Sequence, residues 1–157
     1  MLKTELTVPS DLRFMEVVEH WLLESLRLEI DQDNVDWAEV RMRLRLVVVE
    51  VYSNIVRHAH SDQPDLPILI RIELDEKNNL LLEVWDQGEG FRLDDYAAPS
   101  PSDFQEGGYG WLILNRIMDR VEYHLQVGGD RNCLKLEKDL ASNNKHQKPQ
   151  KPHTNSV

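Results

Sequence analysis

The chain has 157 residues, 41% hydrophobic and 29% charged, which predicts one globular domain with its own apolar core. Its formal net charge of −10 argues against nucleic acid or an anionic membrane as the main partner, because both require a basic face. Apolar runs such as residues 46–49 are far shorter than the roughly 20 residues of a membrane span, and residues 1–11 lack a signal-peptide core. The single cysteine, Cys133, excludes an internal disulfide, and we expect a cytoplasmic protein.

The first part of the chain is predicted to form a short strand and two helices. Residues 3–9 are compatible with a strand, and Asp11 after Ser10 offers a cap for a helix that continues to about residue 30. The segment from about residue 35 to residue 59 is ambiguous, because its first half alternates like a strand. Its apolar stripe is much longer than an ordinary strand, which favours one long helix.

The second part of the chain is predicted to contain two hairpins separated by a loop and a helix. Residues 68–75 and 80–86 form the first hairpin, and residues 121–127 and 132–138 form the second. Between them, residues 93–106 form a polar loop long enough to be a mobile lid, and the glycine-rich residues 107–110 open a third helix.

The order strand, helix, helix, two strands, helix, two strands predicts a two-layer α/β sandwich. We expect a mixed, mostly antiparallel sheet with the helices on one face. Residues 1–140 would form this domain. Residues 141–157 are polar, contain proline and lack periodicity, which is typical of a disordered tail.

The second predicted helix has a polar edge beside its apolar stripe. At about 100° per residue, Glu50, Asn54 and Arg57 fall within roughly 60° of one another. A carboxamide oxygen suits magnesium, a guanidinium suits phosphate oxygens, and a carboxylate one turn away can accept a proton from an attacking hydroxyl. The alternative for this segment alone is an ordinary i,i+4 pair on a solvated face, with His58 packed at the helix end.

Two glycine-containing segments add further signals. Asp86 ends an apolar strand and is followed by Gly88 and Gly90, where glycine either permits a turn or lets the backbone approach a ligand. The sequence GGYG at residues 107–110 precedes a helix whose free N–H groups would face an anion. Taken singly, each segment is equally explained by ordinary turn chemistry.

Together, the three motifs are more specific than any one of them. Glu-x-x-x-Asn with a basic residue three positions later, Asp-x-Gly-x-Gly-Phe at a strand end, and Gly-Gly-x-Gly before a helix resemble the three boxes of the GHKL nucleotide-binding superfamily. The small size and the His-Ala pair after the first box are similar to bacterial anti-sigma factor serine/threonine kinases. The resemblance covers residues from about Leu2 to Lys138 and implies a Bergerat-type ATP-binding fold.

The resemblance implies a role for each matched position. Asn54 would supply the oxygen ligand to Mg²⁺, and Arg57 would approach the phosphates of ATP. Asp86 would accept a hydrogen bond from the adenine amino group, while Gly88 would let the loop pass close to the base. Glu50 would be the catalytic base. The nucleotide-binding residues implied by the resemblance are Asn54, Arg57, His58, Asp86, Gly88, Gly90, Phe91, Gly107, Gly108, Tyr109, Gly110 and Trp111.

The resemblance also implies an activity and partners. The protein would phosphorylate a serine or threonine of an anti-sigma factor antagonist, sequester a sigma factor, and form a homodimer through its first strand and helix. One alternative is a stand-alone histidine-kinase-like ATPase domain, although no dimerisation helices with an acceptor histidine are predicted before the first motif. Another is a non-catalytic, nucleotide-gated binding module. A carboxylate at Glu50 favours the enzyme, because a pure binder does not need one.

Overall fold

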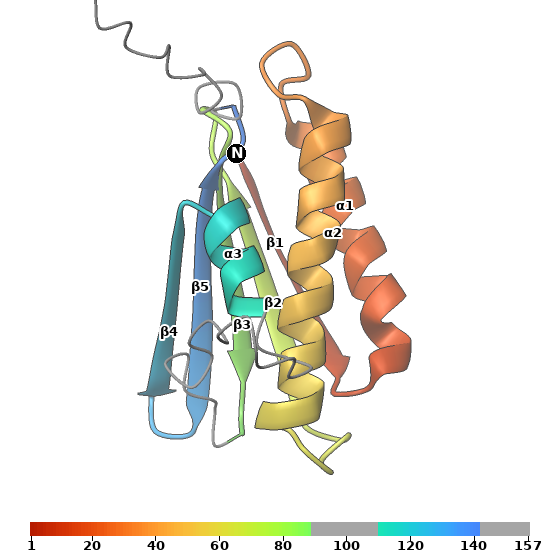
Figure 1. The fold of residues 1–157 in the computed structure, drawn as a ribbon, viewed down its shortest axis with the longest axis vertical. Coiled ribbons are helices and arrows are strands. Elements are labelled where there is room, and N and C mark those ends of the chain that lie inside the picture. Colours follow the sequence, from red (N-terminus) through yellow and green to blue (C-terminus); the bar gives the residue numbers. More distant parts are fainter. Residues whose placement is uncertain (89–109, 142–157) are drawn as a thin grey trace, which may run out of the picture.

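The computed structural model describes residues 1–88 and 110–141, except the side chain of Trp111, and shows a sheet covered by helices on one face (Figure 1). The strands are β1 (Leu2–Pro9), β2 (Pro67–Leu74), β3 (Asn79–Asp86), β4 (Arg120–Val127) and β5 (Arg131–Asp139). The helices are η1 (Leu12–Phe14), α1 (Met15–Glu29), α2 (Trp37–Asn54), η2 (Ile55–Ala59) and α3 (Gly110–Ile117).

The five strands lie in the order β1-β2-β3-β5-β4, and all four pairings are antiparallel. The predicted two-layer α/β sandwich is therefore confirmed. The sheet is antiparallel throughout these pairings, where the sequence suggested a mixed, mostly antiparallel one. β4 runs parallel to β3, but the two are not neighbours, because β5 turns back and pairs between them.

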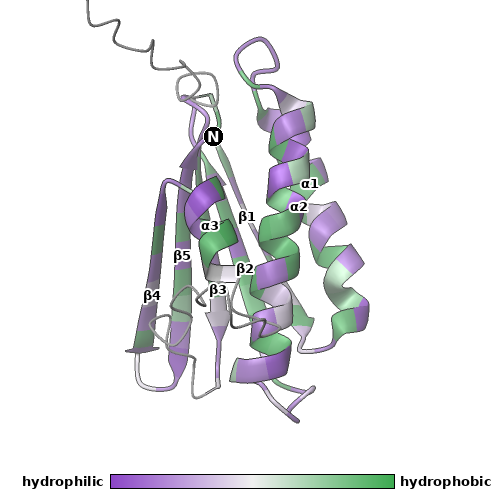
Figure 2. Cartoon of the chain, viewed as in Figure 1, coloured by the Kyte–Doolittle hydropathy of each residue, from purple (hydrophilic) through white to green (hydrophobic). Residues whose placement is uncertain are grey.

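The core lies between the sheet and the helices. Each central strand buries every second side chain on the helix side, as a half-covered sheet requires. In Figure 2 apolar and polar segments follow one another along the strands and along α1 and α2. The buried side chains include Leu22 and Leu26 from α1, Leu44 and Val47 from α2, Ile68 and Ile72 from β2, Leu82 from β3, and Leu134 and Leu136 from β5.

The opposite face of the sheet is polar. Arg71 pairs with Glu5 at 2.9 Å, and it also lies 6.0 Å from the ring centre of Trp85. Arg131 lies 5.0 Å from the same ring centre. Cys133 is buried opposite Trp85, and burial raises its pKa to about 12.

The two first helices differ in detail from the predictions. Asp11 does cap the first helical segment, accepting the Arg13 N–H at 2.9 Å, but that segment is a 3₁₀ turn that continues into α1. The long second helix is α-helical only to Asn54, and Ile55–Ala59 form a π-helical turn. There the His60 N–H donates to the Ile55 carbonyl, five residues back, at 2.8 Å.

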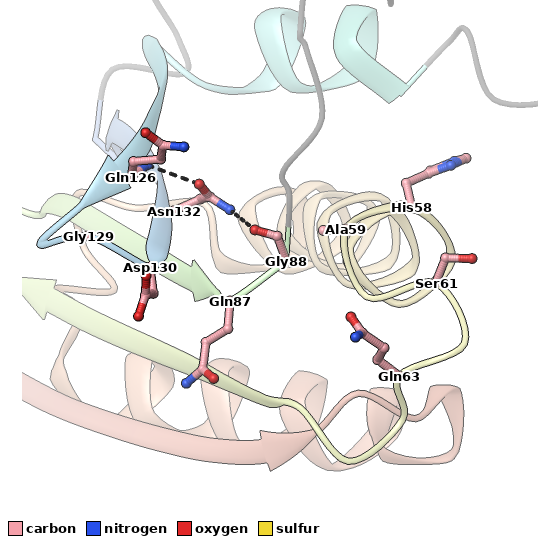
Figure 3. Close-up of a pocket in the computed structure, with 10 residues that line it drawn as sticks. All are labelled: His58, Ala59, Ser61, Gln63, Gln87, Gly88, Gln126, Gly129, Asp130 and Asn132. Atoms are coloured by element: carbon pink, nitrogen blue, oxygen red, sulfur yellow. Dashed lines mark hydrogen bonds between the residues drawn. The ribbon is translucent and has the colours of Figure 1, made fainter.

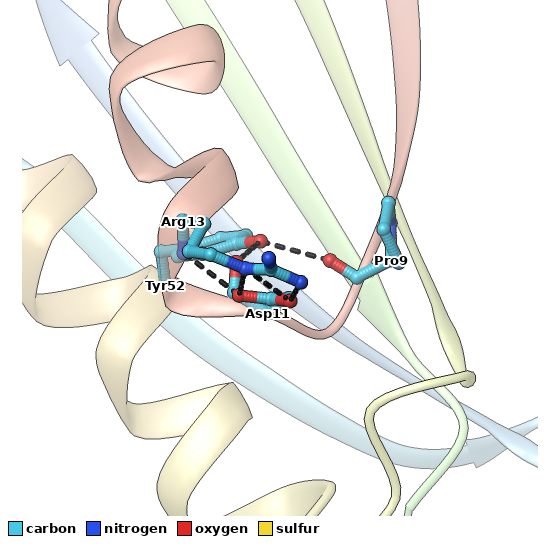
Figure 4. Close-up of polar contacts among 4 residues, drawn as sticks. All are labelled: Pro9, Asp11, Arg13 and Tyr52. Carbon is cyan, nitrogen blue, oxygen red and sulfur yellow. Dashed lines mark hydrogen bonds and ion pairs between the residues drawn. The ribbon is translucent and has the colours of Figure 1, made fainter.

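One tyrosine joins α2 to the start of the chain. The Tyr52 hydroxyl donates to the carbonyl oxygens of Pro9 at 2.9 Å and Asp11 at 2.6 Å, beside the Asp11–Arg13 ion pair (Figure 4). These contacts fix the connection between β1 and α1 against the helix that carries the polar edge.

No helix in the described ranges is long and apolar enough to span a membrane.

Candidate functional site

Two polar clusters lie beside the C-terminal part of the α2–η2 helix, one near the end of α2 and one near the end of η2. The first, the Asn54 cluster, consists of Glu50, Asn54 and Gly110. A Cβ atom on Gly110 would collide with Glu50 Oε2 and would lie 3.4 Å from Asn54 Nδ2. The first residue of α3 therefore rests directly on the polar edge of α2. The predicted first and third motifs thus meet in space, although 55 residues separate Gly110 from Ile55 in the chain.

The second cluster, the Asp86 cluster, consists of Asp86, Gly88, Tyr123 and Asn132. Asp86 is fully buried at the end of β3. Its Oδ2 accepts from the Tyr123 hydroxyl at 2.7 Å, and its Oδ1 accepts from Asn132 Nδ2 at 2.7 Å and from the Gly88 N–H at 3.2 Å. A carboxylate offers about four lone-pair sites, so one remains for a further donor.

Asn132 holds the loop after β3 as well as the carboxylate. Its Nδ2 also donates to the Gly88 carbonyl at 2.9 Å, and its Oδ1 accepts from the Gln126 N–H at 3.1 Å (Figure 3). Asn132 is 2% exposed and lies opposite Asp86 in the β3–β5 register. Both polar atoms of its side chain therefore fix Asp86, the loop and the end of β4 relative to one another.

Gly88 lies against the helix. A Cβ atom there would collide with the Ala59 carbonyl oxygen and approach His60 Cδ2 at 3.1 Å. Glycine is thus required for the loop to pass the backbone of η2. The predicted reason for this glycine, close approach to the base of a nucleotide, stays a prediction, whereas the contact with η2 is a requirement of the fold.

A cavity of about 640 Å³ opens beside Gly88 (Figure 3). The π-helical turn and the loop after it contribute His58, Ser61 and Gln63 to its wall, and the β4–β5 turn contributes Asp130. The lining is mostly polar, and carboxamides are prominent in it. The cavity thus lies at the Asp86 end of the helix, next to the loop that leaves β3.

The remaining predicted side chains of the first motif are exposed to solvent. Arg57 and His58 are exposed on η2, and Arg57 forms no ion pair with any residue in the described part of the chain. A guanidinium in this position is available to an anion. Within residues 1–88 and 110–141, no group of three or more His, Cys, Asp or Glu side chains could hold a metal by itself.

Several predicted site residues are outside the described residues, together with the predicted lid at residues 93–106 and nearly all of the predicted tail. These site residues are Gly90, Phe91, Gly107, Gly108 and Tyr109, and for Trp111 the side chain alone is outside.

Sequence reasoning missed Tyr123, Asn132 and His60. Tyr123 and Asn132 reach Asp86 only because β5 pairs with β3 and β4 pairs with β5. His60 stands immediately after the first motif, but its partners, Ser10 and Gln87, are 50 and 27 residues away. No local pattern in the sequence indicates these contacts.

Comparisons with known proteins show which family the chain belongs to. Residues 8–138 match the family model described as histidine kinase-like ATPase domain. A serine-protein kinase RsbW of Halalkalibacterium halodurans is 26% identical over 127 residues, which are 75% of this chain and 73% of that protein. The RsbW of Bacillus velezensis is 30% identical over 93 residues, 54% of this chain and 58% of that protein.

A solved structure has a similar fold. The crystal structure of the RsbU and RsbW domains of a Mycobacterium tuberculosis protein matches 89% of this chain with a TM-score of 0.61, at 15% identity. The match spans 33% of that longer chain. The resemblance to the anti-sigma factor kinases that the three motifs predicted is confirmed by these similarities. The chain belongs to the histidine kinase-like ATPase domain family.

Proposed function

We propose that this protein is an ATP-dependent serine/threonine protein kinase that phosphorylates a small anti-sigma factor antagonist and sequesters a sigma factor. Membership of an ATPase-domain family implies ATP as the ligand. The observation that carries the proposal is the Asn54 cluster, in which a carboxylate and a carboxamide lie against the first residue of a helix. Two relatives named serine-protein kinases support the choice of a protein hydroxyl as acceptor.

The two clusters suit the two ends of a nucleotide. At the Asp86 end, the remaining acceptor site on Asp86 would take the adenine amino group. At the Asn54 end, the N–H groups at the start of α3 and the exposed Arg57 would face the phosphates. Five residues of helix, a rise of about 7.5 Å, separate Asn54 from Ala59 beside Gly88. The nucleotide would therefore lie along η2.

The residues of the Asn54 cluster also fit magnesium. The Asn54 carboxamide lies one helical turn after the Glu50 carboxylate and carries one oxygen that can ligate a hard cation. Mg²⁺ usually takes only one or two protein ligands, with phosphates and waters completing its shell. The bound ion supplies neutralisation of the phosphate charge during transfer. Asn54 would hold this ion.

Glu50 would act as the base in the transfer. The substrate hydroxyl attacks the γ-phosphorus, its proton passes to the Glu50 carboxylate, and the bond from the γ-phosphorus to the bridging oxygen breaks to release ADP. Phosphoryl transfer depends chiefly on positioning and charge neutralisation. The base therefore increases the rate of a transfer whose reactants the other residues already orient.

The test combines partner capture with a transfer assay. The chain is used to pull down proteins from its native cell, and the recovered proteins are incubated with the chain and radiolabelled ATP. We expect label on a serine or threonine of a small protein. Glu50→Gln should lower this transfer by about 100-fold or more, with ATP affinity by calorimetry unchanged.

The matched control is Glu24→Gln, which removes an exposed carboxylate paired with Arg27 on α1. It should leave transfer unchanged. Full transfer by the Glu50→Gln variant would contradict the role of Glu50. Nucleotide-dependent capture of a partner without any label, by the unaltered chain, would instead favour the non-catalytic binding module.

A further inference from the structure

His60 occupies a central place behind the nucleotide loop. It is 1% exposed and follows the last residue of η2, where the helix ends. The ring lies between two segments that are remote in sequence, the end of β1 at Ser10 and the residue after β3, Gln87. A buried histidine without a charged hydrogen-bond partner is costly unless both ring nitrogens are satisfied, and here both are.

The hydrogen bonds fix the proton on the ring. His60 Nε2 lies 2.8 Å from the Gln87 backbone nitrogen, whose N–H donates to it, so Nε2 carries no proton. In the neutral ring the proton is then on Nδ1, which donates to Ser10 Oγ at 2.8 Å. Ser10 is 2% exposed and is itself held through its N–H by the Pro64 and Leu66 carbonyls, at 3.1 Å each.

Gln87 is the first residue beyond the sheet. The pairing of β3 with β5 ends at Asp86 and Asn132, so no strand accepts the next N–H group. His60 replaces the missing strand partner. The loop is thus held on two sides, by His60 at Gln87 and by Asn132 at Gly88, immediately after Asp86.

We propose that His60 is a positioning residue for nucleotide binding, which fixes the loop after Asp86 through the Gln87 N–H and does so only while its ring is neutral. This inference rests on the proposed ATP site. A protonated ring would present an N–H to the N–H of Gln87, and the bond would be replaced by repulsion. The loop, including Gly88 against Ala59, would then lose its anchor on the helix side.

The surroundings of the ring favour the neutral form. Burial lowers the pKa of His60 below its ordinary 6.5, and the negative charge of Asp86 on β3 opposes this with a smaller effect. Ser10 after β1 and Gln87 after β3 are neutral. Among the described residues, Asp86 is thus the charged group that acts on the ring. Protonation of His60 in the folded protein therefore requires a pH below 6.5.

Two substitutions separate the two hydrogen bonds. His60→Gln places an oxygen near the position of Nε2, keeps an acceptor for Gln87, and does not titrate. His60→Asn reaches only to the position of Nδ1, so it keeps a donor for Ser10 and loses the acceptor for Gln87. The affinity for ATP with Mg²⁺ is measured by calorimetry from pH 5 to pH 8 for the parent and both variants.

On acidification below pH 6.5, we expect the ATP affinity of the parent to fall by about tenfold more than the ATP affinity of His60→Gln. Phosphate groups of ATP ionise near pH 6 in every sample, so the difference between the two profiles isolates His60. His60→Asn should bind about tenfold more weakly than His60→Gln at pH 7.5. Identical profiles for the parent and His60→Gln, or equal affinities of the two variants, would overturn the inference.

A measurement without nucleotide separates this inference from the proposed function. In the unaltered, ligand-free chain, the NMR signal of the Gln87 amide should shift with pH together with the His60 ring. If the Gln87 amide signal did not change while the His60 ring titrates, the proposed link between His60 protonation and the loop would be refuted, even if ATP binds. A chain that fails to bind ATP at any pH while Gln87 follows His60 would refute the proposed ATP site instead.

Discussion

Asp86 shows at the level of single residues how a buried acid is supported. Burying a carboxyl group away from water is unfavourable unless hydrogen bonds replace the lost hydration. Here Tyr123, Asn132 and the Gly88 N–H all donate to it. The group is held in one orientation before any ligand arrives, which reduces the ordering that binding requires.

The Tyr123 hydroxyl tests this support. Tyr123→Phe keeps the ring and removes one donor, so we expect the free energy of unfolding to fall by about 1–2 kcal/mol, measured by urea denaturation. Leu125→Ala, at an exposed position on the same strand, is the control and should change it by less than about 0.5 kcal/mol. Equal stability of Tyr123→Phe and the parent would show that Asp86 does not depend on this donor.

At the level of elements, Tyr52 connects α2 to the segment between β1 and α1. Its hydroxyl is the donor in both contacts, so they require the protonated phenol. Burial, the larger effect, raises the pKa of Tyr52 above 10.0, although the hydrogen bond to Asp11 lowers it. A raised pKa means that the stabilisation is complete below pH 10 and is lost as the pH rises through the folded-state pKa.

Tyr52→Phe should therefore destabilise the protein by about 1–2 kcal/mol at pH 8. The difference from the parent should shrink above pH 10, because the parent then loses the same contacts. Denaturant unfolding at pH 8 and pH 10.5 measures both effects. A difference that stays constant over this range would mean that ionisation of Tyr52 is not linked to folding.

For the whole molecule, ligand binding and folding are linked. At a concentration 100 times Kd, ATP with Mg²⁺ should stabilise the folded chain by about 2.7 kcal/mol, which for a domain of this size raises Tm by about 5–10 °C. GTP should shift Tm less, because guanine has a carbonyl where adenine presents its amino donor to Asp86. Asn54→Ala should reduce the magnesium-dependent part of the shift. An equal shift with both nucleotides would contradict the role proposed for Asp86.

Features with a local cause were predictable from the sequence. The two short runs that became β2 and β3, joined by a polar turn, predicted a hairpin, and the apolar stripe of α2 predicted a long helix; the order of the elements predicted the layers. The insertion of β5 between β3 and β4 depends on long-range pairing, so the contacts of Asn132 with Asp86 were not predictable. The same holds for His60, since its partners come from two different strand ends.

The π-helical turn at Ile55–Ala59 has a consequence for sequence changes in this region. A π turn accommodates one residue more than an α-helical turn of the same length, as if a residue had been inserted into a regular helix. Deleting Val56 would restore regular α-helical winding and leave the residues after it in place, whereas adding a residue to this turn would rotate everything after it by about 100° around the axis. An insertion would thus move the His60 ring away from the strand ends that it links, so this segment should tolerate a deletion far better than an insertion.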